Sequence, residues 1–111
     1  DSAALQEATS AVKAIAIYNA DPDNTTKIGD SILKVGDYYF GMIDGQLVKA
    51  TSTTSSNVTT YTIEAGTYDY TFTISSGAIA NLKLGETDCS TGSAVTVTDV
   101  SPKVSIYPIN P

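Results

Sequence analysis

Residues 2–20 read SAALQEATSAVKAIAIYNA, and this stretch decides the fold class because it is the one clearly helical segment of the chain. Alanine, leucine, glutamine, glutamate and lysine all favour helices. Apolar residues recur at the spacing of a single buried helix face, at Leu5, Ala8, Val12, Ile15 and Tyr18. The polar face thins after Lys13, so we expect the C-terminal half of this helix to be the more deeply covered.

The two ends of the helix carry different signals. Pro22 disfavours the α conformation at Asp21 and has no backbone N–H, so the helix should end there. Asp1 and Ser2 are suitable N-terminal caps. The apolar pattern nevertheless begins at once, with no lead-in, which suits a helix cut from a longer one as well as a natural start.

The rest of the chain predicts short antiparallel strands, beginning with a hairpin. Residues 37–43 (DYYFGMI) and 46–51 (QLVKAT) are apolar runs joined by Asp44-Gly45. An Asp-Gly pair in this position indicates a type I′ turn, in which both residues need positive φ. The following polar, low-complexity residues 51–57 (TSTTSSN) predict a loop.

The strand at residues 67–74 (TYDYTFTI) has the clearest pattern, because aromatic or aliphatic residues alternate with polar ones. Its expected buried face consists of Tyr68, Tyr70, Phe72 and Ile74. Further strands are expected at residues 58–63, 78–84, 94–100 and 104–109, with a polar loop at 86–93. Pro108 suggests that the last strand is an unpaired edge or tail.

These elements predict an α+β fold. The helix must bury its apolar stripe and the antiparallel sheet must bury one face, and packing the N-terminal amphipathic helix across a β-sheet meander satisfies both. We expect one domain over residues 1–111, with the helix at 1–20, a connecting loop at 21–36 and the sheet at 37–111.

Composition narrows the classes of function. Hydrophobic residues make up 41% of the 111 residues, which is enough for one packed core. The six basic residues are all lysines, they are scattered, and twelve acidic residues outnumber them. Nucleic-acid binding through a basic patch is therefore not expected. Serine and threonine make up about a quarter of the chain, which is typical of extracellular β-rich proteins and of glycosylated surfaces.

The sequence contains no recognisable catalytic set. There is no histidine, which rules out Ser–His–Asp and Cys–His sites and the standard zinc motifs, and there is no glycine-rich phosphate loop. Glu64, Asp69 and Glu86 could supply a pair of glycosidase carboxylates, but nothing marks one of them as buried. We therefore expect a protein that is not an enzyme and has no cofactor.

One acidic stretch offers oxygen ligands. Asp21, Asp23 and Asp30, with Asn24 between them, resemble part of a calcium loop, but the glycine and the terminal glutamate of an EF-hand are not at the required positions. These residue types are also ordinary in helix stops and turns, and that interpretation is favoured. Two sequons make Asn24 and Asn57 candidates for N-glycosylation.

Two further residue types allow a functional and a structural interpretation. The single cysteine, Cys89, cannot form an intramolecular disulfide, so it is a partly buried small side chain or half of an intermolecular bridge. Tyr38, Tyr39, Tyr68 and Tyr70 could form a stacking surface for a sugar or a protein. We expect Tyr38, Tyr68 and Tyr70 to face the core instead, since strand aromatics usually serve in packing.

The order of an alanine-rich amphipathic helix (residues 2–20), a loop (21–36), an antiparallel sheet and a Ser/Thr-rich surface resembles the soluble head of a type IV pilin or pseudopilin. In that family an apolar half-helix upstream builds the filament core, and the amphipathic half packs on the sheet. The apolar segment with its early glutamate is absent from this sequence, as are the two C-terminal cysteines common in many such pilins. No functional residue can be carried over.

The resemblance implies a structural subunit of an extracellular filament, whose partners are copies of itself, with host or surface glycans as further candidates. A membrane contact would come only through an upstream helix. The alternatives are a secreted carbohydrate-binding or adhesin module, or a viral surface protein. A conventional signal peptide ending at Asp1 would contradict the pilin hypothesis, whereas an apolar helix with a short basic leader would support it.

Overall fold

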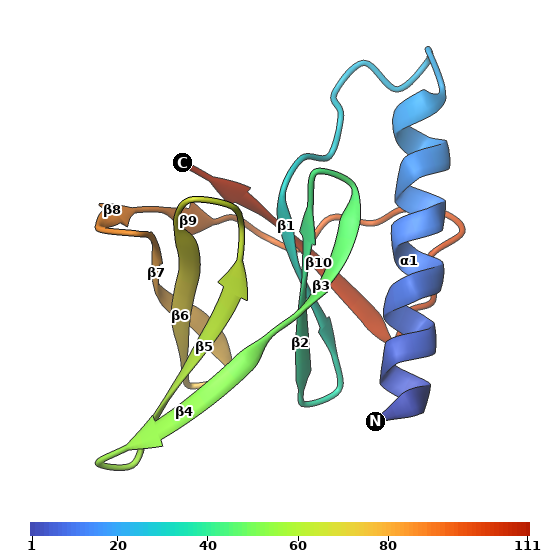
Figure 1. Cartoon of the computed structure of the whole chain (residues 1–111). Helices are drawn as coiled ribbons and strands as arrows, with labels where there is room; N and C mark the ends of the chain where they lie inside the picture. The colour runs from blue at the N-terminus through green and yellow to red at the C-terminus, as the bar shows by residue number, and fades with distance from the viewer.

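The computed structural model describes residues 1–111 and contains one helix and ten strands (Figure 1). Two five-stranded antiparallel sheets are present, in the orders β3-β2-β1-β10-β9 and β4-β5-β6-β7-β8. The elements are α1 (Ser2–Ala20), β1 (Ser31–Val35), β2 (Tyr38–Ile43), β3 (Gln46–Lys49), β4 (Thr51–Ser55), β5 (Val58–Glu64), β6 (Asp69–Ser75), β7 (Ala78–Leu84), β8 (Thr87–Asp88), β9 (Ser90–Thr91) and β10 (Val104–Asn110).

The first sheet lies between α1 and the second sheet, so the molecule has three layers (Figure 1). Alternation along its strands assigns the side chains to the two faces. Leu33 and Val35 of β1 pack against α1, whereas Ile32 between them points to the second sheet. The result is two apolar cores, one under the helix and one between the sheets. The α+β fold, with an N-terminal helix packed on antiparallel sheet, is as predicted.

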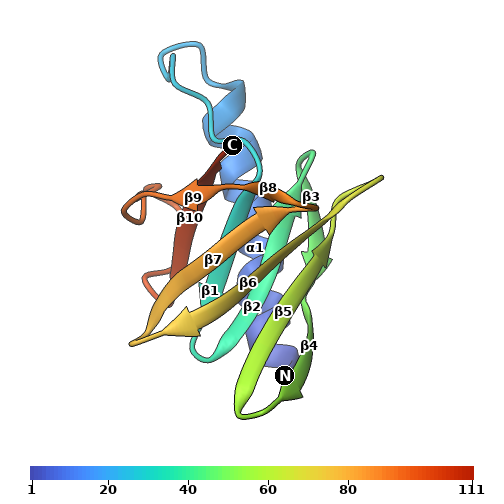
Figure 2. The ribbon, with the colours of Figure 1, turned by 90° about the vertical axis from the view of Figure 1, so that its left-hand side faces the viewer.

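The two sheets are joined at both edges by chain that leaves one sheet and enters the other. β3 runs into β4 through Ala50, whose N–H donates to the Tyr39 carbonyl (3.4 Å). β8 runs into β9 through Cys89, whose N–H donates to the Leu82 carbonyl (2.9 Å). The strands therefore surround one apolar interior, and Figure 2 shows the second sheet lying in front of the first with its strands at an angle.

Several local predictions are confirmed. The helix has the predicted bounds to within one residue, and Asp1 caps it because its Oδ1 accepts from the Ala3 N–H (2.8 Å). Asp21 follows the last helical residue with an extended backbone, as expected for the residue before a proline. Asp44 and Gly45 have φ of 52° and 75°, which gives the hairpin between β2 and β3.

Two segments predicted as loops contain strands. The predicted connecting loop 21–36 includes β1, which is hydrogen-bonded to β2 on one side and β10 on the other. The predicted loop 51–57 includes β4, which pairs with β5 through a turn at Ser56 and Asn57 (φ 52° and 65°). Threonine is β-branched and fits a pleated ribbon even where both faces are wet, so polarity alone was a misleading signal.

The C-terminal third also differs from prediction. Two sheets form where one was expected, and the predicted polar loop 86–93 holds β8 and β9. Residues 94–100 form no strand and make only an isolated bridge between Val95 and Ile106. Pro108 does not mark an unpaired edge, because β10 lies between β1 and β9. A proline is tolerated here because β9 pairs only with Ile109 and Asn110, so Pro108 has a ladder partner on the β1 side alone.

The burial of α1 departs from the prediction in its last turn, which is largely exposed. Its buried residues are small in the first three turns and end at Ile15; they are Ala4, Ala8, Ala11, Ala14 and Ile15. Leu5, Val12 and Tyr18 flank this line and are only partly buried. Ile17 is 69% exposed, because the C-terminal part of α1 extends beyond the sheet (Figure 1). The structure contains no helix that combines the length and apolarity needed to cross a membrane.

Candidate functional site

The structure does not bring the three candidate metal ligands together. Asp21 lies at the end of α1, and its Oδ1 accepts from the Asp23 N–H (2.9 Å), which is a local turn. Asp30 lies at the start of β1 and binds other partners. No group of three or more acidic, histidine or cysteine side chains has an arrangement that could hold a metal ion.

Asp30 instead connects three segments that are distant in the sequence. Its Oδ1 accepts from the Asp44 N–H (3.1 Å) and its Oδ2 accepts from the Tyr70 hydroxyl (3.3 Å). Its carbonyl accepts from the Ile109 N–H. Burial, followed by the charge of Asp30 and the hydrogen bond to it, raises the pKa of Tyr70 to about 12. The carboxylate of Asp30 therefore links the β2–β3 turn to β6, and its backbone carbonyl binds β10.

The two sequon asparagines have different environments. Asn24 is partly buried, and its Nδ2 donates to the Tyr18 carbonyl at the end of α1 (3.1 Å). Its side-chain amide is therefore already hydrogen-bonded within the protein. Asn57 is exposed at the tip of the β4–β5 hairpin, in the left-handed conformation. Of the two, Asn57 is the one whose amide is open to a modifying enzyme.

The four tyrosines considered for a stacking surface are not all exposed. Tyr39 and Tyr70 are buried, whereas Tyr38 is 47% exposed and Tyr68 is 62% exposed. Tyr68 precedes β6 and lies over Gly85, and Tyr38 lies at the start of β2 beside the N-terminus of α1. The core-facing prediction is thus right for Tyr70 and wrong for Tyr38 and Tyr68, because both exposed rings sit at strand ends, where the opposite layer stops.

The carboxylates considered for glycosidase chemistry are all on the surface. Glu64 and Asp69 face each other across β5 and β6 as the last pair of that ladder, and both are exposed. Glu86 is exposed in the turn after β7. A general acid needs a raised pKa, which burial would provide. None of the three has that environment.

Cys89 is half-buried at the point where the chain passes from β8 to β9. It packs against the core between the sheets and its thiol is free. Its Sγ lies 3.6 Å from the Thr87 carbonyl. The side chain thus serves the packing of this corner.

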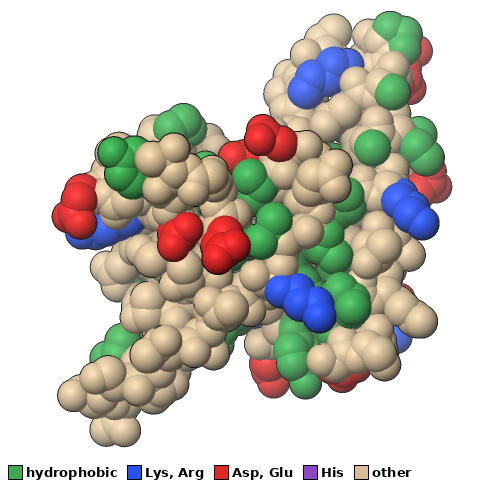
Figure 3. Space-filling view, viewed as in Figure 1, with side chains coloured by type: hydrophobic (Ala, Val, Ile, Leu, Met, Phe, Trp, Pro, Cys, Tyr) green, Lys and Arg blue, Asp and Glu red, His purple; other side chains and the backbone are tan.

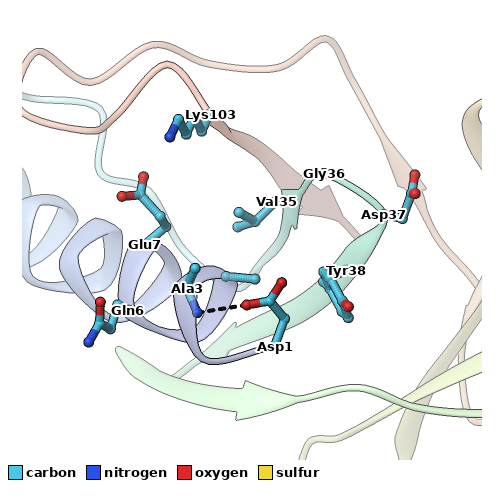
Figure 4. Close-up of a pocket in the computed structure, with 10 residues that line it drawn as sticks. Asp1, Ala3, Gln6, Glu7, Val35, Gly36, Asp37, Tyr38 and Lys103 are labelled. Carbon is cyan, nitrogen blue, oxygen red and sulfur yellow. Dashed lines mark hydrogen bonds between the residues drawn. The ribbon is translucent and has the colours of Figure 1, made fainter.

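One hollow lies beside the N-terminus of α1 and has a volume of about 470 Å³ (Figure 4). Its lining includes four charged residues, Asp1, Glu7, Asp37 and Lys103, and the ring of Tyr38. Glu7 Oε2 is buried there without a hydrogen-bond partner. No ion pair closes the hollow, since the single salt bridge of the chain is Lys83 to Asp88 at 4.0 Å, on the second sheet. The arrangement can hold a polar group but contains no acid–base or nucleophilic pair.

A second hollow of about 470 Å³ lies between β5 and β6, and we call it the β5–β6 groove. Its lining residues come from the β4–β5 turn, β5, β6 and β7; they are Asn57, Val58, Thr59, Tyr61, Thr73, Ile74 and Asn81. Sequence analysis identified neither Tyr61 nor Asn81, because they are brought together only by the pairing of three strands. The positive φ of Asn81 (56°), inside a strand, is a signal visible only in the structure.

Comparison of the chain with protein families, with curated proteins and with solved structures gave no match.

Proposed function

We propose that this chain is a structural subunit of an extracellular filament, with the architecture of a type IV pilin-like head. The observation that carries the proposal is the position of α1. The helix lies along the outside of the molecule, one side on the first sheet and the other side uncovered, with the N-terminus at one end of the molecule (Figure 1). This placement leaves α1 free to contact neighbouring copies along its length.

The uncovered side of α1 is apolar near its C-terminus. Ile17 is the most exposed large hydrophobic side chain in the chain, at 69%, and the neighbouring Ala16 and Ala20 are exposed as well. Figure 3 shows hydrophobic side chains at the surface over the upper part of α1. A second helix laid against these small side chains would bury Ile17, a contact of the kind that drives subunit association.

The experiment compares filament assembly by the natural gene product and by two variants with the same new charge. Ile17→Asp places a carboxylate in the proposed helix contact, whereas Thr53→Asp places one on the exposed strand β4, away from α1. Both positions are exposed, so neither change should alter the melting temperature by more than a degree or two. We expect negative-stain electron microscopy to show filaments for the parent and for Thr53→Asp, and few or none for Ile17→Asp.

Two results would overturn the proposal. One is a full yield of filaments from Ile17→Asp, with the variant folded. The other is a gene in which a conventional secretory signal peptide, and no apolar helix, directly precedes Asp1.

A further inference from the structure

The β5–β6 groove exists because two paired strands separate. β5 and β6 are in register from Tyr61–Phe72 to Glu64–Asp69, but residues 58–60 of β5 pair only with β4. Residues 73–75 of β6 likewise pair only with β7. The strands therefore diverge from Tyr61 and Phe72 toward the β4–β5 turn, and Figure 2 shows the opening between them. The groove occupies the space between the two separated strand segments.

The floor of the groove at this divergence is rigid and aromatic. Tyr61 and Phe72 stack with an interplanar angle of 15° and ring centroids 5.3 Å apart. Tyr39 contacts both rings, with centroids at 4.9 Å from Tyr61 and 5.6 Å from Phe72. Tyr39 and Phe72 are buried, whereas Tyr61 is half-buried and lines the groove. The Tyr61 ring is thus held in place by two neighbours while part of it stays open to solvent.

The polar side chains around the groove carry amides and hydroxyls and no charge. Asn81 donates through Nδ2 to the Thr73 hydroxyl (2.8 Å), which fixes its amide and leaves the Oδ1 acceptor available. Asn57, on the opposite side, is exposed at the tip of the hairpin. A volume of about 470 Å³ lies within the range of small-molecule sites, about 300–1,000 Å³.

We propose that the β5–β6 groove binds a neutral oligosaccharide, with one sugar ring against Tyr61 and sugar hydroxyls hydrogen-bonded by Asn57 and Asn81. An aromatic face next to uncharged donors and acceptors matches the apolar C–H face and the hydroxyl rim of a pyranose. Acidic sugars do not match it, because no cation lines the groove and the protein carries a net charge of −6. This site is independent of the helix contact in the proposed filament.

An extended peptide is the competing occupant, since both strand segments beside the groove have a free edge. The register of β6 with β7 shifts between Thr71 and Thr73, where β6 borders the groove. The extra residue lies in β7, and a bulge of this kind increases the local twist of the β6–β7 pair, which disfavours the addition of another strand to β6. This irregularity, together with the amide and hydroxyl lining, favours the sugar.

The test is an NMR titration of the ¹⁵N-labelled chain with named probes. Maltotriose, cellotriose, chitotriose and mannotriose serve as neutral saccharides, sialyllactose as the acidic one, and the peptide Thr-Val-Thr-Val-Thr as the strand. We expect saturable shifts from at least one neutral trisaccharide at the amides of residues 57–61, 73–74 and 81, with no saturable shifts from the other two probe types. Saturable shifts with the peptide alone, or no saturable shifts with any neutral saccharide at millimolar concentration, would overturn the proposal.

The variants are chosen to keep the fold. Asn57 and Asn81 have positive φ (65° and 56°), a conformation that glycine adopts freely, so Asn57→Gly/Asn81→Gly removes both amides without backbone strain. Loss of two hydrogen bonds should weaken binding about tenfold or more. The matched control, Asn110→Gly, removes an exposed asparagine at the end of β10 and should leave affinity unchanged. If the double variant and the control bind the saccharide with equal affinity, Asn57 and Asn81 do not contact it, and the proposed binding site is refuted.

Discussion

Gly41→Ala should destabilise the protein through a single contact between the two sheets. Gly41 lies in β2 on the face that packs against β5, and its φ is in the ordinary range. A Cβ added there would lie 2.5 Å from Cγ2 of Ile63 and 3.3 Å from its Cδ1. Ile63 is fully buried, so it has no open space into which it can move.

The magnitude follows from this geometry. Overpacking a tight core costs about 1–3 kcal/mol, and a carbon–carbon approach of 2.5 Å belongs at the upper end. For a chain of this size, about 3 kcal/mol lowers the melting temperature by about 10–15 °C. The assay is thermal and urea unfolding followed by circular dichroism, with Gly92→Ala as the matched control. Gly92 has no atom within 4 Å of its added Cβ and no positive φ, so that change should be neutral or slightly stabilising.

A double-mutant cycle separates this clash from other causes. Ile63→Ala alone should cost about 2–5 kcal/mol, because it leaves a cavity between the sheets. In that background the new Cβ at position 41 has room, so Gly41→Ala should then cost less than about 1 kcal/mol. If Gly41→Ala leaves the stability of the parent unchanged, or costs the same in both backgrounds, the close approach of β2 and β5 is refuted.

Three further predictions concern the helix and the Asp30 connection. Ile15→Asp buries an unpaired charge under α1 and should cost about 4 kcal/mol or more, enough to unfold much of the protein; unchanged urea unfolding would mean that the helix is misplaced. Asp30→Ala leaves the Asp44 N–H and the Tyr70 hydroxyl without their acceptor and should cost about 1–3 kcal/mol by urea unfolding; a neutral effect would contradict the connecting role. The pKa of Tyr70, raised to about 12, lies above its ordinary value, so the folded state keeps the phenol proton that the unfolded state loses. The contribution of Tyr70 to the free energy of unfolding should therefore be fully present below about pH 10 and fall by about 2–3 kcal/mol as the pH rises through about 12. The Tyr70→Phe variant should lose less stability over this range. Identical alkaline unfolding profiles of the two proteins would exclude Tyr70 as the cause.

The local elements were largely predictable because their signals are local. Helix formers and the Pro22 stop defined α1, and Asp44-Gly45 defined the β2–β3 hairpin, since only certain residues adopt positive φ at low cost. β1 and β4 were missed for two reasons. The apolar core of β1 is only a few residues long, and the polarity of β4 obscured the strand preference of its threonines.

The candidate sites were the least predictable part. Asp30 reads as a turn residue or a metal ligand in the sequence, but its partners Asp44 and Tyr70 are 14 and 40 residues away. The β5–β6 groove depends on the point at which two strands separate, and no residue type signals that point. Such features depend on contacts between residues that are far apart in the chain. Composition and periodicity do not reveal these long-range contacts.

The sequence by itself thus determined the fold class, the start and end of the helix, the β2–β3 hairpin and the lack of a histidine-based catalytic set. Only the tertiary structure decided that the strands divide into two sheets around a second core, and that Ile17 of α1 faces outward while Ile15 is buried. The physical reason is that hydrophobic burial has no direction. The sequence shows that burial of an apolar side chain would be favourable. The length and position of the layer packed against it decide whether that side chain is buried.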